Sequence, residues 1–317
     1  MTIREKLARL TLAAATLALA LPVWADDNHP GSGWSQLNMP AGVTDISRKI
    51  YNLHMEIFWV CVWIGVVVFG VMIWSLINYR KSSGAVADVG LVHNTKVEFV
   101  WTVVPVIILI AMAVPAARVL VEIEDTTRAG LTVKVTGFQW GWQYDYLDNG
   151  VLFYSHLDRR SNAARELSSG IDPSTVPHYL LNVDQPFVVP VGIKVRLLIT
   201  GADVIHSWWV PSFGVKKDAI PGFINEAWFK IDADKPGLYR GQCAELCGRD
   251  HGFMPIVVDA RPQADFEAWL KSTAAAEKAA EQQQASPAAT PAAGAPAGSA
   301  ASQGSTAAAA QAAPPSG

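Results

Sequence analysis

Two long stretches without a charged residue constrain the fold of this chain more than any other feature. Ile57–Ile77 contains 21 residues and Phe99–Ala117 contains 19, and neither includes Asp, Glu, Lys or Arg. As helices they would be about 28–32 Å long, which matches a hydrocarbon core about 30 Å thick. The sequence therefore predicts a transmembrane hairpin over residues 53–122, with spans at about 55–78 and 98–119, rather than two buried helices of a soluble protein.

The N-terminus has the features of an export signal. Three basic residues within the first nine positions precede the apolar stretch Leu10–Leu21, and small side chains follow at Val23 and Ala25. Twelve apolar residues are too few to cross a bilayer, so a membrane anchor is the weaker interpretation. We expect residues 1–25 to be a cleaved signal peptide and residues 26–52 to be an exported segment. The loop between the spans would then be cytoplasmic, and the chain beyond about residue 119 would be exported.

Residues 123–262 change to short apolar and β-branched runs that Gly, Pro, Asn and Asp interrupt. Many short strands without a helical pattern between them indicate an all-β sandwich or barrel. Residues 263–281 are predicted to form a C-terminal helix with Phe266, Trp269 and Leu270 on one face. The tail 282–317 has no charge and no large apolar side chain, so we expect it to be disordered. The strand candidates are Leu131–Phe138, Val151–Leu157, Tyr179–Val183, Phe187–Val191, Lys194–Thr200, Ala227–Ile231, Gly237–Gly241 and Ile256–Asp259.

Composition excludes several classes of protein. Charged residues make up 17% of the chain, below the roughly 25% of a typical soluble domain. A net charge of −3 argues against a basic nucleic-acid-binding protein, so no nucleic acid is expected as a partner. Three cysteines are too few for a disulfide scaffold. No Cys-x-x-Cys-His sequence occurs, so a covalently attached c-type haem is not expected.

The motif with the clearest chemistry lies between residues 241 and 255. It reads Gly-Gln-Cys-Ala-Glu-Leu-Cys-Gly-Arg-Asp-His-Gly-Phe-Met-Pro and brings two thiols, an imidazole and a thioether into twelve residues. Sulfur ligands select copper over Mg²⁺ or Ca²⁺, and imidazole suits copper and zinc. The glycines and the proline predict a loop that can surround an ion. His206, which follows a predicted strand, could supply a second imidazole.

Other interpretations of this motif compete. Cys243 and Cys247 could form a disulfide in an oxidising compartment, but that leaves His251 and Met254 without a role. Zinc is possible, although a thioether is not among its usual ligands. A blue-copper site uses two His, one Cys and a weak axial Met, which is one thiol fewer than occurs here. Two bridging thiolates with one His for each metal would hold a pair of copper ions.

This motif, with the upstream Asp-Val-Ile-His-Ser-Trp, resembles subunit II of the haem–copper cytochrome c oxidases over roughly residues 45–270. The resemblance implies a two-helix transmembrane hairpin followed by a cupredoxin-like Greek-key sandwich, which holds a dinuclear CuA centre. It places the protein in the bacterial inner membrane, as a multi-pass protein with the copper domain on the periplasmic side. The implied copper ligands are His206, Cys243, Cys247, His251, Met254 and the backbone carbonyl of Glu245.

The resemblance also implies the reaction and the partners. The subunit would accept electrons one at a time from cytochrome c and pass them to the haem–copper centres of subunit I, where O₂ is reduced to water with proton pumping. The Glu245 carboxylate would help bind a Mg²⁺ or Mn²⁺ ion shared with subunit I. Subunit III and the lipid bilayer are the further expected partners.

A surface for the electron donor is implied in the same way. Trp140 matches the residue through which electrons enter from cytochrome c, although packing in the sandwich is an alternative role for this ring. Asp145 and Asp203 match acidic docking positions. Residues 119–270 contain five more acids than bases, which would attract a basic cytochrome c. Phe138 and Gly141 depart from the residues usual in the family, so the local surface differs.

Glu98 has two compatible roles at the start of the second span. With Thr95 three residues before it, it fits a capping box in which Thr95 begins the helix. An acid at a membrane boundary is also a functional candidate, and the resemblance places a carboxylate here at the mouth of a proton channel. The remaining histidines match no ligand spacing, and Cys61 is expected to be a small apolar side chain of the first span.

Three alternative functions share part of this pattern. A membrane-tethered copper chaperone can carry Cys-x-x-x-Cys and a distant His, but it would have one span and a thioredoxin-like αβ pattern. A quinol oxidase subunit keeps the fold and lacks the copper ligands. A soluble nitrous oxide reductase shares the copper motif and has no such pair of spans.

Overall fold

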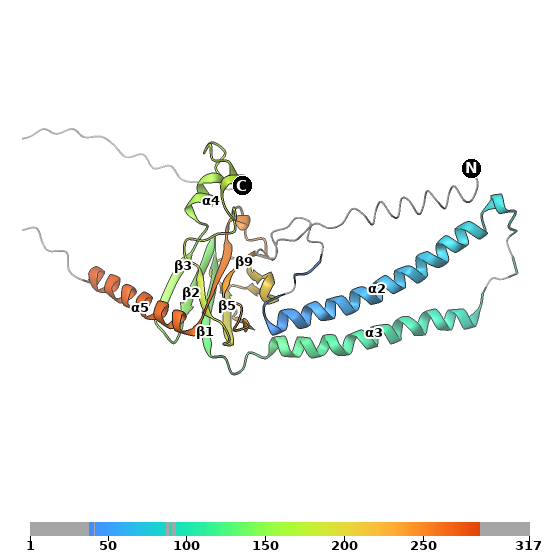
Figure 1. The fold of residues 1–317 in the computed structure, drawn as a ribbon, viewed down its shortest axis with the longest axis horizontal. Coiled ribbons are helices and arrows are strands. Elements are labelled where there is room, and N and C mark those ends of the chain that lie inside the picture. Colours follow the sequence, from blue (N-terminus) through green and yellow to red (C-terminus); the bar gives the residue numbers. More distant parts are fainter. Residues whose placement is uncertain (1–37, 41, 87–88, 91–92, 286–317) are drawn as a thin grey trace, which may run out of the picture. The chain divides into compact units, whose positions relative to one another are not determined.

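The computed structural model describes residues 38–40, 42–86, 89–90 and 93–285 (Figure 1). The chain divides into two compact units, Met1–Glu277 and Lys278–Gly317, and the first contains every element discussed below except the end of the last helix. The expected signal peptide, residues 1–25, and the tail beyond residue 285 lie outside the described residues.

Two long helices, α2 (Asp45–Asn78) and α3 (Thr95–Glu124), contain the two uncharged stretches. Both are long and apolar enough to cross a membrane, with mean hydropathy of 2.6 and 2.5 in their most apolar windows. None of the residues in these windows is buried within the chain, so their side chains face outward. Pro105 and Pro115 lie inside α3; in a membrane, neighbouring groups can satisfy the carbonyls that a proline frees.

The start of α3 corrects one prediction. The N-cap residue is Asn94, and its side-chain oxygen accepts hydrogen bonds from the backbone N–H groups of Lys96 and Val97, at 3.1 and 3.3 Å. Thr95 is therefore the first residue inside the helix, and the capping box predicted on Thr95 is wrong. Asn is at least as good an N-cap as Thr, which explains the shift by one residue. The Glu98 carboxylate still contributes, because it accepts from the backbone N–H of Asn94 at 3.1 Å.

The rest of the first unit is a β-sandwich, as predicted. One five-stranded sheet has the order β3-β2-β1-β5-β8 and the other has the order β4-β10-β9-β6-β7. Pairing is antiparallel except for β1 with β5 and β4 with β10. The strands are β1 (Leu131–Phe138), β2 (Gly141–Tyr146), β3 (Val151–Ser155), β4 (Phe187–Pro190), β5 (Val195–Gly201), β6 (His206–Val210), β7 (Val215–Ala219), β8 (Asn225–Phe229), β9 (Gly237–Cys243) and β10 (Pro255–Arg261).

Alternation of side chains builds the core between the sheets. Buried and half-buried residues alternate along β1 and β5, since successive strand residues point to opposite faces. Tyr144 of β2 and Phe187 of β4 stack across the sandwich with their ring centroids 4.5 Å apart. The Tyr146 hydroxyl donates to the carbonyl of Val188 at 2.6 Å, so this buried polar group is satisfied.

The strand predictions were mostly correct. Residues 179–183 form turns instead of a strand, with only an isolated bridge between Val183 and Leu157. The segment between β3 and β4 instead contains α4 (Arg159–Ala164) and the short 3-10 helix η2 (Pro173–Thr175). Strands β2, β6 and β7 were not among the candidates. β7 reads Val-Lys-Lys-Asp-Ala, in which only the two end residues are apolar and buried.

The C-terminal helix α5 (Gln263–Ala285) continues four residues beyond the predicted end at 281. Residues 282–285, which were assigned to the disordered tail, are therefore helical. Phe266 is buried, and Trp269 and Leu270 pack against the same core, which confirms the predicted face. Trp269 lies with its ring centroid 5.5 Å from that of Tyr146.

The first turn of α2 is built into the sandwich. Thr44 caps α2: its Oγ1 accepts from the Ser47 N–H at 3.0 Å and donates to the Phe213 carbonyl at 2.8 Å. Thr44 also bridges to Ile231, and both Thr44 and Ser47 are buried. A side-chain carbon at Gly214 would meet the backbone of Ser47 at 3.0 Å, so the contact is a close one.

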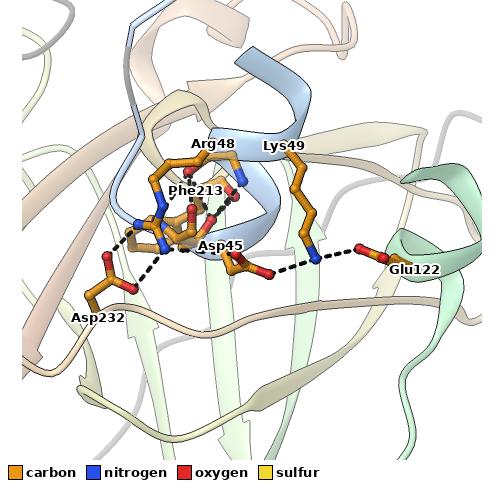
Figure 2. A network of polar contacts seen from close by, with 8 residues as sticks. Asp45, Arg48, Lys49, Glu122, Phe213 and Asp232 are labelled. Carbon is orange, nitrogen blue, oxygen red and sulfur yellow. Dashed lines mark hydrogen bonds and ion pairs between the residues drawn. The ribbon is translucent and has the colours of Figure 1, made fainter. Parts of the chain in front are cut away.

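Charged side chains surround this joint (Figure 2). The guanidinium of Arg48 binds both carboxylate oxygens of Asp232, which follows β8. Lys49 lies 2.8 Å from Asp45 on the same helix and 2.6 Å from Glu122 near the end of α3. The network thus links the start of α2, the end of α3 and the sandwich.

Candidate metal centre

The motif residues meet at one end of the second sheet. His206 is the first residue of β6 and Cys243 is the last residue of β9. These two strands are neighbours, with Trp208 opposite Cys243. The chain from Cys247 to Met254 forms a loop between β9 and β10, and it includes the short 3-10 helix η4 (His251–Phe253).

The ligand atoms of His206, Cys243 and Cys247 all lie within 4.8 Å of one another, and all three residues are buried. The two thiol sulfurs are 3.9 Å apart and both cysteines are free. Two further groups approach the Cys247 sulfur: Nδ1 of His251 at 3.5 Å and Sδ of Met254 at 3.4 Å. Two thiols, two imidazoles and a thioether are therefore grouped around one point.

The carbonyl oxygen of Glu245 also reaches this group, because it accepts from the Cys243 thiol at 3.3 Å. The Glu245 side chain is exposed. The Glu245 carbonyl therefore faces the cysteine cluster, whereas its carboxylate is accessible from outside the domain.

The two thiols differ in acidity. Burial raises the pKa of Cys243, but the neighbouring His206 ring and nearby backbone groups outweigh burial and hold the pKa below its ordinary value. At Cys247, burial and the charge of Cys243 act in the same direction and raise the pKa to about 12. The site alone therefore favours one thiolate, and a second thiolate needs additional positive charge. A bound metal cation supplies such charge and removes the proton of a coordinating thiol.

His206 is held by one ring nitrogen and leaves the other available. Its Nε2 lies 2.9 Å from Oδ1 of Asp203, whereas its buried Nδ1 has no hydrogen-bond partner in the part of the chain that the structure describes. Burial lowers the pKa of His206, but Cys243 and Asp203 together raise it above its ordinary value. A ring fixed at one nitrogen by a carboxylate, with the other nitrogen open, is the usual arrangement of a metal-binding histidine.

This donor set fits a soft metal ion. An unpaired buried nitrogen is costly unless something binds it, and the neighbouring sulfur atoms are ligands that select copper or another thiophilic metal. The residues present therefore fit the pair of copper ions that the sequence motif suggests.

Trp140 is partly buried, packs against the core and lies beside the metal loop. Its indole N–H donates to the Cys247 carbonyl at 3.2 Å, and the ring is half-buried. The guanidinium of Arg249 lies 5.7 Å from the ring centroid. A side-chain carbon at Gly248, where φ is +121°, would meet the indole at 3.0 Å, so glycine allows this close approach. Trp142, in contrast, is fully buried.

The two candidate docking acids differ in their surroundings. Asp203 is 34% exposed at its side chain, and it accepts from the backbone N–H groups of Gln139 and Val204, both at 2.7 Å, in addition to contacting His206. Asp145 is half-buried on β2, five residues beyond Trp140 and so roughly 17 Å away along an extended chain. The structure thus brings Asp203 into the site and leaves Asp145 outside it.

Glu98 lies outside the cluster at the start of α3. Its carboxylate is 3.0 Å from Nδ1 of His93, and both side chains are well exposed. His93 matches no ligand spacing in the sequence, because a lone histidine outside a recognised motif carries no signal.

Sequence reasoning also missed residues that hold the loop. The Gln139 side-chain amide donates to the Cys247 carbonyl at 2.8 Å, and the Trp142 indole donates to the Met254 carbonyl at 3.3 Å. Their position next to Trp140 in the sequence was the only available signal, since neither residue type indicates contact with a metal loop.

Comparisons with known proteins match both the helical and the β-sandwich parts of this chain. Residues 32–119 match the transmembrane domain of the family "Cytochrome C oxidase subunit II", and residues 131–261 match its periplasmic domain. A probable cytochrome c oxidase subunit 2 of Rickettsia bellii is 37% identical over 237 residues, which cover 75% of this chain and 84% of the relative. The cytochrome c oxidase subunit 2 of Cyanidium caldarium is 36% identical over 251 residues, 77% of this chain and 93% of the relative.

Among solved structures, the periplasmic domain of cytochrome oxidase subunit II from Bradyrhizobium japonicum is 43% identical to the matched part of this chain. The match covers 47% of this chain and 96% of that domain, with a TM-score of 0.39.

Proposed function

Because the chain belongs to the cytochrome c oxidase subunit II family, we propose that it accepts electrons from cytochrome c at a dinuclear copper centre and passes them to subunit I. The observation that supports this most directly is the meeting of two free thiols with an unpaired imidazole nitrogen and a thioether. The proposed ligands are His206, Cys243, Cys247, His251, Met254 and the carbonyl of Glu245.

The chain's own residues would prepare this centre. A bound copper pair supplies one-electron redox chemistry. The two cysteines, one in a strand and one in the adjoining loop, place their sulfurs 3.9 Å apart, so both would help to hold the copper. Asp203 orients His206, and the sandwich holds the β6 and β9 ends in register. A rigid ligand set lowers the energy barrier to electron transfer compared with a flexible one, because its atoms move little when the charge of the centre changes.

Electrons would enter through Trp140. This side chain is partly exposed and its indole N–H bonds the carbonyl of Cys247, so one hydrogen bond joins the ring to a ligand residue. Asp145 and Asp203 would contribute to an acidic docking face that attracts a basic cytochrome c and speeds association at low salt.

Glu98 would serve at the mouth of a proton channel that continues into subunit I. Its exposed carboxylate pairs with His93, and both groups can carry a proton. The Glu245 carboxylate would face subunit I and share a Mg²⁺ or Mn²⁺ ion with it. Together with subunit III, these subunits would form the proton-pumping oxidase, and O₂ would be reduced in subunit I.

The proposed location follows from the same family membership. Residues 1–25 would be removed as a signal peptide, the hairpin would cross the bacterial inner membrane twice, and the sandwich would lie in the periplasm. A copper chaperone is disfavoured by the paired spanning helices and the all-β domain.

Electron paramagnetic resonance of the purified oxidase, with copper counted by mass spectrometry, tests the proposal. We expect a seven-line hyperfine pattern from one electron shared by two copper nuclei, and loss of that pattern in Cys247→Ser. Cys61→Ser, which removes an exposed thiol of α2, is the matched control and should keep it. A four-line pattern would mean a single copper ion, and a Cys243–Cys247 disulfide without copper would reject the site altogether.

A further inference from the structure

Arg165 reaches the metal loop from a separate segment. It follows α4 directly, in the segment between β3 and β4 that the sequence analysis left without a role. One guanidinium nitrogen lies 3.4 Å from Oδ1 of Asp250, and the guanidinium carbon lies 4.4 Å from the ring centroid of Phe253. A single side chain thus contacts the loop at two points.

These two points lie at the two ends of the short helix η4, because Asp250 is its N-cap residue and Phe253 is its last residue. Asp250 directly precedes His251, and Phe253 directly precedes Met254. Arg165 therefore contacts the residue before each of the last two proposed copper ligands. Within this turn, backbone hydrogen bonds run from Phe253 to Asp250 at 2.9 Å and from His251 to Gly248 at 3.2 Å.

The contact is shielded and anchored. The side chains of Arg165 and Asp250 are only 23% and 16% exposed, so water screens their attraction less than it would at the surface. The Nε of Arg165 donates to Asn162 at 2.7 Å, which fixes the guanidinium plane. Arg249 lies 3.4 Å from the other oxygen of Asp250 but is 82% exposed, so it is the weaker partner.

The α4 segment itself is tied down. Asp158 caps α4 and accepts from the backbone N–H groups of Arg160 and Ser161, both at 3.0 Å. The buried hydroxyl of Ser161 accepts from the backbone N–H of Leu180 at 3.2 Å. The backbone next to Arg165 is therefore held in place by hydrogen bonds, so the Arg165 side chain can restrain the loop that it contacts.

We propose that Arg165 is a positioning residue that holds His251 and Met254 in place through Asp250 and Phe253. This inference rests on the proposed function, because it concerns the copper ligands named there. Without the guanidinium, Asp250 would lose its shielded partner and Phe253 its stacking partner. The turn between the two ligands would then be held by its backbone bonds, the Trp142 bond to the Met254 carbonyl and the exposed Arg249 contact, and copper would leave more readily.

The test uses the purified oxidase carrying Arg165→Ala, with Arg159→Ala as the matched control on the exposed side of the same helix. The rate of copper loss to a chelator and the copper hyperfine splitting are measured. We expect copper loss to be faster by about tenfold in Arg165→Ala, since a charge-assisted contact is removed, together with altered hyperfine splitting. Arg159→Ala should match the unmodified oxidase in both measurements.

Two further variants separate positioning from general loss of structure. Asp250→Asn combined with Arg165→Ala should release copper no faster than the worse single variant, because both changes remove one interaction. Arg165→Lys keeps the charge but cannot stack as a plane. We therefore expect it to lose copper more slowly than Arg165→Ala and faster than the unmodified oxidase. Additive effects of Arg165→Ala and Asp250→Asn, or copper loss and splitting unchanged in Arg165→Ala, would overturn the inference.

Failure of the proposed function would look different. If the unmodified oxidase held no dinuclear copper, the ligand assignment itself would be wrong, before any comparison of variants. Thermal unfolding and haem content, measured on the same samples, identify a variant that has merely failed to assemble. In that case Arg165→Lys provides the comparison, and copper retention equal to that of the unmodified oxidase would count against the inference.

Discussion

Asp203 and His206 are joined by a 2.9 Å contact between a carboxylate oxygen and Nε2, whereas the buried Nδ1 of the same ring has no hydrogen-bond partner among the described residues. The acid that was predicted only as part of a docking surface therefore also orients a proposed ligand. The two roles can be separated, because Asp145 has the same predicted docking role and no contact with the cluster.

Asp203→Asn should weaken copper binding by about 10- to 100-fold, the usual effect of removing the carboxylate behind a metal-bound histidine. Asp145→Asn should leave copper binding unchanged and slow cytochrome c oxidation only at low ionic strength, because it removes only a steering charge. Copper titration and turnover measured across a salt series check both results. Equal copper affinity in the two variants would show that the Asp203–His206 contact does not matter.

Glu98→Gln should lower turnover and proton uptake if the carboxylate delivers protons. The structure provides a sharp control, because the main helix cap is the Asn94 side chain. Asn94→Ala removes that cap and keeps the carboxylate, so it should leave proton uptake unchanged. Proton uptake by oxidase in vesicles, followed with a pH-sensitive dye, distinguishes the two. A similar decrease in both variants would mean that Glu98 acts through the helix end.

Thr44→Ala should lower the free energy of local unfolding at the start of α2 by about 1–2 kcal/mol, because a buried cap and the bond to the Phe213 carbonyl are both lost. Lys49→Ala should cost less than about 1 kcal/mol, because Lys49 and its partners are largely exposed. Hydrogen exchange of the backbone amides in the first two turns of α2 measures the difference. Faster exchange in Lys49→Ala than in Thr44→Ala would reverse this order.

Acidification should destabilise the sandwich partly through Glu226. A hydrogen bond from Arg196, and then one from Thr126, hold the pKa of Glu226 below its ordinary value of 4.5. The unfolded chain therefore binds this proton first as the pH falls, so the stabilisation is present above pH 4.5 and disappears as the pH falls through the folded-state pKa.

Glu226→Gln should make the free energy of unfolding depend less on pH below 4.5, as measured by urea denaturation of the full chain at several pH values. Glu166→Gln, at an exposed position, is the control and should keep the original dependence. A pH dependence in Glu226→Gln as steep as that of the unmodified chain would contradict the assignment.

The pattern of apolar residues along the sequence predicted the two membrane helices and most of the strands. The two spans follow from their lack of charge, and strands such as β1 follow from strict alternation of buried and half-buried residues. β7 escaped prediction because Lys216, Lys217 and Asp218 occupy its middle and only neighbouring strands make it extended. Tyr179–Val183 was predicted wrongly because its apolar residues cover a turn: Leu180 has φ of +63°, which a strand does not allow.

The site shows the same limit. The sequence could suggest five of the six proposed ligands because cysteine, histidine and methionine carry their chemistry in their identity, whereas the Glu245 carbonyl followed from the family resemblance. It could not indicate Arg165 or the second role of Asp203, because arginine and aspartate are common surface residues. Contacts such as those of Arg165 with Asp250 and Phe253 join segments that are far apart in the sequence, here 158–165 and 247–254. Only the folded structure shows that these segments meet.

The bridge between Thr44 and Ile231 has a consequence for the order of assembly. Residue 44 is synthesised long before its partners Phe213 and Ile231, so the first turn of α2 has no partner in the sandwich until strands β1 to β6 have been synthesised. Closing such a distant pair is slow compared with local pairing. The joint is therefore expected to form last, and the β-domain would gain its fixed attachment to the membrane helices only after its own strands have paired.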